Sequence, residues 1–331
     1  MKSTLKHQNL SELINRELAD LNLPEEPGQL YEPVRYTLDL GGKRLRPYFT
    51  LISCGMCGGE VQEAVPAALA IELLHNFTLL HDDIMDAADT RRGQPSVFKK
   101  WNSSTAILSG DVMFAHSFEQ LQHYGKSARY SKKQYATIMD IFLEAARTVC
   151  EGQAFDLEYA ARTDVTIDEY LKMIRGKTAA LISGSLMLGG AVADVDAEKL
   201  ELLRRIGQQA GTAFQIQDDL LDVIADPKKF GKTPGGDIIE GKKTYLSILA
   251  LQQGNKEQKT FINNVLAAQD IATEKVTEVI DLYEELGIVE KTNNAIEKHY
   301  AKSMELLDQF PESDYKTDLI NYFNKLKNRE F

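Results

Sequence analysis

Two clusters of aspartate residues are the part of this sequence best suited to metal chemistry. Both have the pattern Asp-Asp-x-x-Asp, at 82–86 and 218–222, and both lie in mostly apolar stretches that predict helices. On a helix, residues i, i+1 and i+4 lie on one side, so each cluster places three carboxylates together. Carboxylates in an apolar setting are best neutralised by hard divalent cations such as Mg²⁺, which often shares its shell with substrate phosphates. Two such clusters facing each other would form a metal-lined site for a diphosphate.

Basic motifs elsewhere in the chain could bind phosphate oxygens that metals leave free. Arg91 and Arg92 follow the first aspartate cluster, and guanidinium groups form paired hydrogen bonds to phosphate. Segment 41–47 contains three cations where one helix can end in glycines and another can begin at a proline. A glycine-rich segment, 231–244, follows the second cluster and carries lysines. Taken singly, each motif has a plain alternative: a surface ion-pair network, a solvated basic turn and an ordinary loop.

The elements that must position these motifs are helices. Apolar residues recur three and four positions apart, as at Ile138, Ile141 and Phe142, and strict alternation is nearly absent. Residues 96–226 contain no proline, the strongest helix breaker. The sequence therefore predicts an all-α bundle of about ten or more helices. Neither half has its own set of phosphate-binding residues, so we expect a single domain over residues 1–331.

Composition and charge narrow the class of protein. With 331 residues and 43% apolar composition, the chain can bury a large core. The balance of 38 basic and 49 acidic residues, a net charge of −11, argues against nucleic-acid binding. Three cysteines suit a reducing compartment better than a disulfide framework. Residues 1–9 carry no apolar run, so we expect a cytoplasmic protein without stable membrane insertion.

Taken together, the motifs resemble those of the trans-isoprenyl diphosphate synthases, which form the polyprenyl synthetase family. The resemblance rests on motifs in a set order: Gly-Gly-Lys-Arg-Leu-Arg-Pro at 41–47, His75 upstream of His81-Asp82-Asp83, the Asp-x-x-Asp that follows, Arg91-Arg92-Gly93, Gly176-Lys177-Thr178, Phe214-Gln215-Ile216-Gln217-Asp218-Asp219 and the later Gly-Lys pairs. These motifs span about residues 29–250. The resemblance implies the isoprenoid synthase fold, in which helices surround a central cavity, and a homodimer.

The resemblance also implies a reaction. An allylic diphosphate ionises, isopentenyl diphosphate attacks the allylic cation through its alkene, and loss of a proton gives an allylic diphosphate five carbons longer. This is a head-to-tail (1′-4, trans) prenyl transfer, and the released pyrophosphate would accept the proton. The resemblance implies about three Mg²⁺ ions per active site, with Mn²⁺ as a substitute.

The family's pattern assigns roles to the carboxylates and to four polar residues between the two clusters. The chief Mg²⁺ ligands would be Asp82, Asp86 and Asp218, and the direct or water-mediated supports would be Asp222, Asp83 and Asp219. Thr178 and Gln215 would turn oxygen atoms toward the carbocation. Gln153 and Asp156 resemble a helper position between the two acidic helices.

Two sets of basic residues resemble the family's contacts to its two substrates. The expected contacts to the allylic diphosphate are Arg91, Lys177, Lys232 and Lys242. The expected clamp on isopentenyl diphosphate consists of Lys43, Arg46, His75 and Arg92. Lys242 and Lys243 are adjacent, and this segment lacks the proline that many relatives place after Thr244. We expect Lys242 to be the lysine that reaches the diphosphate.

Product length depends on what blocks the growing apolar chain. Phe77 lies five residues before Asp82, about 7.5 Å along a helix axis. In this family a large ring at that place acts as a floor, whereas the plain alternative is an ordinary core side chain. Thr78 is small where one type of farnesyl synthase carries a second ring, and the acidic motif lacks a two-residue insertion. The pattern favours a C20 product, then C15, with a longer-chain synthase as the alternative.

Other classes of protein share some of these features. A terpene cyclase would carry a different second metal motif and would not need segment 41–47. A metal phosphohydrolase could use His81-Asp82 with His75, but that leaves 218–222 unexplained. A non-catalytic partner subunit of a synthase would retain the helices and typically lose acidic residues, none of which is missing here. Incubation with Mg²⁺, isopentenyl diphosphate and allylic diphosphates separates these alternatives.

Overall fold

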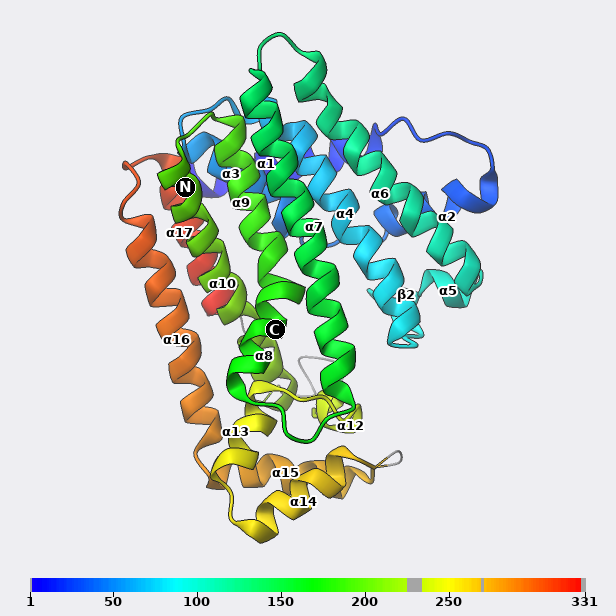
Figure 1. Cartoon of the computed structure of the whole chain (residues 1–331), viewed down its shortest axis with the longest axis vertical. Coiled ribbons are helices and arrows are strands. Elements are labelled where there is room, and N and C mark those ends of the chain that lie inside the picture. Colours follow the sequence, from blue (N-terminus) through cyan, green and yellow to red (C-terminus); the bar gives the residue numbers. More distant parts are fainter. Residues whose placement is uncertain (1, 225–233, 269–270, 329–331) are drawn as a thin grey trace. The chain divides into compact units, whose positions relative to one another are not determined.

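The computed structural model describes residues 2–224, 234–268 and 271–328, with side chains from residue 10 onward, and these residues form a helical structure (Figure 1). Well over ten helices occur in the described part of the chain, which confirms the all-α prediction. The exception is one ladder of two very short strands. Lys232, a predicted phosphate contact, lies outside the described residues.

The helices belong to two compact units. Unit 1 comprises the described residues within 1–146, 184–204 and 310–319. Unit 2 comprises those within 147–183, 205–309 and 320–331. Each unit combines segments that are distant in the sequence. The expectation of a single domain with a central cavity is not tested by this division and stays a prediction.

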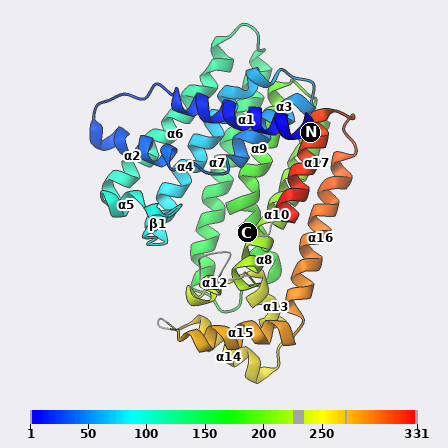
Figure 2. The ribbon, with the colours of Figure 1, turned by 180° about the vertical axis from the view of Figure 1, so that it is seen from behind.

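Unit 1 is built mainly from the N-terminal helices. These elements are α1 (Lys2–Ala19), α2 (Gly28–Asp39), α3 (Leu45–Met56), the 3₁₀ turn η1 (Val61–Ala64), α4 (Val65–Met85), α5 (Val97–Lys100), α6 (Ser103–Lys126) and the first part of α7 (Lys132–Ala160). Helices α4 and α6 run side by side in both views (Figures 1 and 2), and α1 contacts α3 and α4. The first aspartate cluster therefore lies at the end of a helix that is packed on several sides.

Helix α4 is apolar around most of its circumference. The stretch Val61–Met85 is long and apolar enough to cross a membrane by length and composition alone. Within it, 67% of the most apolar window is buried in the structure, as expected for a helix at the centre of a core. Glu72 and Asn76 are polar residues on its buried part.

A tight hairpin follows α4. Its strands are β1 (Thr90–Arg91) and β2 (Gln94–Pro95), and Arg91 pairs with Gln94. The two residues between them, Arg92 and Gly93, have φ values of 54° and 75°. Positive φ at both central positions is the requirement of the type I′ hairpin turn. The hydroxyl group of Tyr36 donates to the Pro95 carbonyl oxygen at 2.8 Å, which ties the hairpin to α2.

Unit 2 contains the second aspartate cluster. Its elements are the end of α7, α8 (Ile167–Ile174), the π-helical turn η2 (Arg175–Ala179), the start of α9 (Ala180–Val192), most of α10 (Ala197–Ile224), α12 (Gly236–Ile239), α13 (Tyr245–Gln253), α14 (Lys256–Leu266), α15 (Thr273–Glu285), α16 (Ile288–Leu307) and the end of α17 (Asp314–Lys327). Helices α14 and α15 lie beside each other in both views. The second aspartate cluster occupies the last turns of α10.

Polar caps fix several helix starts in unit 2. Thr166 and Glu169 form a reciprocal capping box at the start of α8. Asn255 and Gln258 do the same for α14, and the Thr244 side chain accepts a hydrogen bond from the Ser247 N–H group at the start of α13. Each cap satisfies N–H groups that have no partner within the helix, so these boundaries are specified locally.

Two glycines allow α7 to approach η2 very closely. A Cβ atom added to Gly152 would lie 2.1 Å from the backbone nitrogen of Lys177. A Cβ atom added to Gly176 would lie 2.8 Å from the Gly152 Cα atom. The π-helical turn that carries Lys177 and Thr178 is thus placed against α7 by backbone contact. Such turns recur at functional sites.

We expect Gly152→Ala to lower the free energy of unfolding by about 1–3 kcal/mol or more, because the added methyl group must displace backbone. Urea unfolding followed by circular dichroism measures this change. Gly28→Ala is the matched control, because its Cβ atom would only meet the end of the flexible Glu32 side chain, at 3.3 Å. An unfolding midpoint of Gly152→Ala equal to that of wild type would contradict the close contact.

Candidate functional site

The predicted site residues form one group in each unit, and each group is described by itself. In unit 1, Asp82 and Asp83 lie in the last turn of α4 and Asp86 is its C-terminal cap. Asp82 is half-buried, Asp83 is buried and Asp86 is exposed. The Asp86 N–H group donates to the Asp82 carbonyl oxygen at 2.8 Å, so the two residues are one helical turn apart.

Asp83 is held by the first arginine of the hairpin. The Nε group of Arg91 donates to Oδ1 of Asp83 at 2.9 Å, and Nη2 of Arg91 makes a second, short contact with the same oxygen. Burial raises the pKa of Asp83, and the hydrogen bonds and charge of Arg91 oppose that shift. Asp83 is therefore engaged with Arg91, and the exposed Asp86 carboxylate is the more accessible to a metal ion.

We call Lys43, Arg46, His75 and Arg92 the basic cluster. Lys43 is exposed, and Nη1 of Arg46 lies 3.0 Å from Nε2 of His75. Burial lowers the pKa of Arg46 to about 10, so its guanidinium group is still charged at neutral pH. Burial lowers the pKa of His75 well below its ordinary value. The positive charges of Arg46 and Arg92 lower it further. The imidazole ring is therefore neutral.

The contact between Arg46 and His75 leaves two donors without a partner. Arginine can only donate, so Nε2 of the neutral ring accepts and the ring proton is on Nδ1. Both His75 Nδ1 and Arg46 Nε are buried and have no hydrogen-bond partner within the part of the chain that the structure describes. Unsatisfied buried donors beside cationic groups fit an anion with several oxygen atoms.

Arg92 completes the cluster from the hairpin turn. Its Nη1 group donates to the Gly41 carbonyl oxygen. A Cβ atom added to Gly42 would lie 2.8 Å from the guanidinium carbon of Arg92, so glycine is required for this approach. Burial lowers the pKa of Arg92, and the charge of Arg44 adds to the shift. The predicted clamp residues Arg46, His75 and Arg92 thus lie within one structural neighbourhood.

In unit 2, Asp219 is the centre of a hydrogen-bonded network. Its Oδ2 atom accepts from the Tyr170 hydroxyl group at 2.6 Å and from the Tyr245 N–H group at 3.0 Å. Its Oδ1 atom accepts from Nε2 of Gln215 at 3.1 Å, and Oε1 of Gln215 accepts from the Thr178 hydroxyl group at 2.7 Å. Burial raises the pKa of Asp219 to about 7, although these hydrogen bonds oppose the shift. The network fixes the orientation of the Gln215 amide.

A cavity of about 120 Å³ opens beside this network. It is lined by fourteen residues, among them Lys177, Thr178, Gln215, Asp219 and Lys242. The ammonium group of Lys177 lies 2.5 Å from a carboxylate oxygen of Asp156, the residue that the sequence places with Gln153 at a helper position. Six predicted site residues of unit 2, including Asp156, therefore share one cavity.

Asp222 and Lys242 meet through a residue that the sequence analysis did not single out, Asp237. The Asp237 N–H group donates to Oδ2 of Asp222 at 2.9 Å, and Nζ of Lys242 lies 3.4 Å from Oδ1 of Asp237. Burial raises the pKa of Asp237 to about 6, and Lys242 opposes the shift. Nζ of Lys242 also lies 2.5 Å from Glu240, whereas Nζ of Lys243 donates to the Gly241 carbonyl oxygen. Both lysines line the cavity, so the choice between them stays a prediction.

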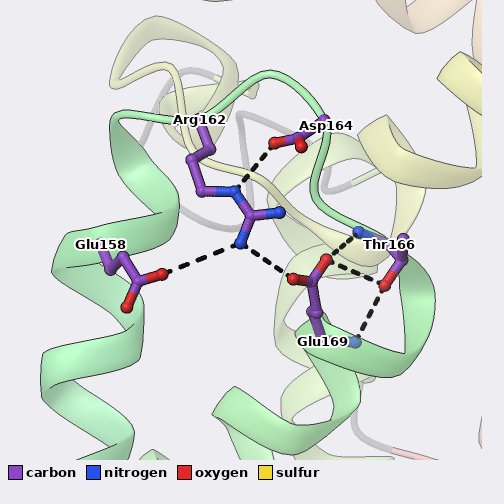
Figure 3. A network of polar contacts seen from close by, with 5 residues as sticks. All are labelled: Glu158, Arg162, Asp164, Thr166 and Glu169. Carbon is purple, nitrogen blue, oxygen red and sulfur yellow. Dashed lines mark hydrogen bonds and ion pairs between the residues drawn. The ribbon is translucent and has the colours of Figure 1, made fainter.

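An arginine joins α7 to α8 at one wall of this cavity. Figure 3 shows Arg162 between Glu158, Asp164 and Glu169, with closest distances of 3.8, 2.8 and 2.8 Å. Its guanidinium carbon also lies 5.3 Å from the ring centroid of Tyr159, a buried cavity-lining residue. The network holds the loop between α7 and α8 against both helices.

The carboxylates do not form a closed metal cage. Among the described residues, no group of three or more His, Cys, Asp or Glu side chains is gathered closely enough to hold a metal ion alone. Mg²⁺ is usually bound through one or two carboxylates together with substrate phosphates. Pairs of oxygen donors such as Asp82 and Asp86 fit that mode of binding.

Several residues of these sites were missed at the level of sequence. Tyr170 gave no signal, because it occupies an ordinary apolar position of a helical pattern. Asp237 lies within the glycine-rich segment 231–244, where no local pattern distinguishes it. Glu72 did offer a signal, since a charge within a long apolar helix needs a partner. Its partner, Arg44, was included in a predicted motif without a role of its own.

Comparisons with known proteins identify the class. The polyprenyl synthetase family model matches residues 27–284. A short chain isoprenyl diphosphate synthase from Methanocaldococcus jannaschii is 39% identical over 83% of this chain and 82% of its own length. A geranylfarnesyl diphosphate synthase from Natronomonas pharaonis is 32% identical over 97% and 96%. The crystal structure of geranylgeranyl pyrophosphate synthetase from Pyrococcus horikoshii has a TM-score of 0.92, at 35% identity, and covers 99% of both chains.

The chain belongs to the polyprenyl synthetase family. It is a trans-prenyl diphosphate synthase, a prenyltransferase of isoprenoid biosynthesis. This family uses divalent metal ions with diphosphate substrates. The motif-based expectation of fold and reaction class is therefore confirmed.

We expect Tyr170→Phe to lower the free energy of unfolding by about 1–3 kcal/mol, because Asp219 loses one of its donors while it remains buried. Chemical denaturation measures the change. Tyr283→Phe is the matched control in the same unit, since the Tyr283 hydroxyl group is buried without a partner among the described residues. Its removal should be neutral or slightly stabilising. Equal losses in the two variants would show that the Tyr170–Asp219 hydrogen bond contributes nothing specific.

Proposed function

We propose that this synthase condenses isopentenyl diphosphate head-to-tail (1′-4) with an allylic diphosphate and makes a C20 or C15 prenyl diphosphate. The observation that carries the proposal is the basic cluster, in which two buried donors, Arg46 Nε and His75 Nδ1, have no partner among the described residues. Such a site binds a diphosphate without a metal ion. A terpene cyclase has no use for this second diphosphate site.

The carboxylates are proposed to bind the metal ions. Asp82, Asp86, Asp218 and Asp222 would hold Mg²⁺, or Mn²⁺ in its place. The bound metal would supply positive charge to the diphosphate of the allylic substrate as that group departs. Asp83 and Asp219 support the site differently, because Oδ1 of Asp83 accepts from Arg91 and both oxygen atoms of Asp219 accept hydrogen bonds from Tyr170 and Gln215. They would orient neighbouring groups and bind the metal through water.

Side chains of the protein bind and orient the two substrates. Arg91, Lys177 and Lys242 are proposed to contact the allylic diphosphate, as is Lys232, which lies outside the described residues. Gln215 is held by Asp219 on one side and by Thr178 on the other, so its carbonyl oxygen keeps one orientation. Oxygen atoms of fixed orientation beside the developing carbocation stabilise it electrostatically. No side chain is needed as a base, because the released pyrophosphate can take the proton.

Phe77 is proposed to limit the length of the product. Its ring is half-buried and stacks on Phe114 with a centroid distance of 5.1 Å, and His81 meets it edge-on at 4.7 Å. A Cβ atom added to Gly110 would lie 3.3 Å from the Phe77 ring, so α6 packs closely against it. The neighbouring Thr78 is small, and its hydroxyl group donates to the His75 carbonyl oxygen. A ring held in this way supports a fixed floor.

The remaining expectations are part of the same proposal. We propose that residues 1–331 act as one domain, that the reaction needs the residue groups of both units, and that the protein works in the cytoplasm as a homodimer. The retained aspartates of both clusters disfavour the alternative of a non-catalytic partner subunit. A longer-chain synthase is the alternative for product length.

We expect purified protein with Mg²⁺, labelled isopentenyl diphosphate and a C5, C10 or C15 allylic diphosphate to form extended prenyl diphosphates, and EDTA to abolish the reaction. Asp82→Asn and Asp218→Asn should each lower kcat by about 10²-fold or more, because each removes charge from a metal ligand. Thin-layer chromatography of the products gives both rate and chain length. Glu201→Gln, an exposed residue of α10, is the control. Cyclic hydrocarbon, free phosphate or no product would contradict the proposed reaction.

We expect Phe77→Ala to shift the products toward longer chains, because it removes the ring that blocks the apolar tail. Chromatography of the dephosphorylated products reports the distribution. Phe261→Ala, a half-buried phenylalanine in α14, controls for the loss of an aromatic ring elsewhere. A product distribution that stays the same in Phe77→Ala would rule out this residue as the floor and leave it as ordinary core.

A further inference from the structure

A buried ion pair lies beside the basic cluster, and neither of its partners belongs to that cluster. Nη1 of Arg44 lies 2.6 Å from Oε1 of Glu72, and the two side chains are only 6% and 2% exposed. Removing two charges from water costs about as much as their attraction returns, so such a pair adds little net stability compared with apolar residues. Stability therefore does not explain why this pair is present.

Arg44 holds its own backbone in an unfavourable conformation. It is the residue before α3 and has φ 47° and ψ 38°, the left-handed region that residues with a Cβ atom avoid. Its Nη2 group donates to the carbonyl oxygen of Leu38 in α2 at 2.6 Å, while Nη1 reaches Glu72 in α4. One side chain thus joins α2, α3 and α4 at the turn that connects Lys43 with Arg46.

Glu72 is fixed from a second direction. Nδ2 of Asn76 donates to the same Oε1 atom at 3.1 Å, and Asn76 also bonds to the Glu72 carbonyl oxygen at 2.8 Å. His75 of the basic cluster lies between these two residues on α4. The carboxylate that anchors Arg44 is therefore part of the same helical turn that presents His75.

Glu72 also acts on the charges of the cluster. Burial lowers the pKa of Arg46 most, the negative charge of Glu72 raises it, and the positive charge of Arg92 has a smaller lowering effect. Glu72 likewise raises the pKa of Arg92, against burial and the charge of Arg44. The cations of the cluster repel one another before a diphosphate arrives, and Glu72 offsets part of that repulsion.

We propose that Glu72 is a positioning residue for isopentenyl diphosphate. It acts through Arg44, whose ion pair keeps the left-handed turn in place and so sets the direction in which Lys43 and Arg46 leave the backbone. Glu72 does not touch the substrate. This inference rests on the proposed function, because it takes the basic cluster to be the site of isopentenyl diphosphate.

The test compares Glu72→Gln with wild type in two measurements. In the prenyl-transfer assay, we expect the KM for isopentenyl diphosphate to rise about tenfold or more, while the KM for the allylic diphosphate stays within about twofold. In calorimetric titrations in EDTA, we expect the Kd of isopentenyl diphosphate to weaken by a similar factor. Glu63→Gln is the matched control, because Glu63 pairs with Arg129 and Tyr130 away from the cluster. It should leave both constants unchanged.

A double variant separates positioning from stability. Replacement of both partners, Arg44→Met with Glu72→Met, removes the buried charges together and should return the melting temperature close to that of wild type. The Kd and KM for isopentenyl diphosphate should nevertheless stay raised, because the turn has lost its anchor. Recovery of binding along with stability would overturn the proposal, as the pair would then be structural only. The same variant keeps the test decisive if Glu72→Gln does not fold.

The result for wild type keeps the two proposals apart. If wild type forms no prenyl diphosphate and binds no isopentenyl diphosphate in EDTA, the proposed function fails. If wild type is active and Glu72→Gln leaves the KM and Kd for isopentenyl diphosphate within twofold of wild type, only the positioning role fails. Equal rises in the KM values of both substrates would also overturn it, since that pattern reports a general loss of structure.

Discussion

Like charges must be held close together in this protein before any ligand arrives. Two unit charges 4 Å apart repel each other by about 4 kcal/mol at an effective dielectric constant of 20. The structure offsets part of this repulsion by setting two of the cations against carboxylates from other elements: Arg91 against Asp83, and Lys177 against Asp156. The carboxylates in turn are placed by helices whose positions are set by the packing of their apolar side chains. The substrate-facing chemistry thus depends on ion pairs that are already made in the free protein.

Spacing and composition were enough to predict the helices, the aspartate clusters and the motifs that identify the family. Those features depend on the identity of a residue and its distance along one helix, both of which are visible in the sequence. The network around Asp219 was not predictable, because its donors come from positions 170, 215 and 245. Contacts between separate helices are set by packing, and no local pattern records them. Residue Glu72 was visible only as a charge in an apolar helix, without its partner.

Phe77, the residue proposed to limit product length, is a second case in which contacts between helices are not visible in the sequence. Phe77 is recognisable from its place before the first aspartate, but the packing around its ring is not visible in the sequence. That packing comes from Phe114 and Gly110 of a different helix. The similar proteins from Natronomonas pharaonis and Pyrococcus horikoshii carry names that refer to different chain lengths, geranylfarnesyl and geranylgeranyl. The motifs therefore identify the reaction class, whereas the contacts of Phe77 are set by packing between helices.

The type I′ hairpin after α4 places two neighbouring arginines on different partners. Arg91 contacts Asp83 of the first aspartate cluster, and Arg92 contacts Gly41 of segment 41–47. Because the turn has only two residues, a shift of one position in its register would exchange the two guanidinium groups. The spacing between the acidic cluster and the hairpin is then as constrained as the residues themselves. A change in loop length here would alter both contacts in a single evolutionary step.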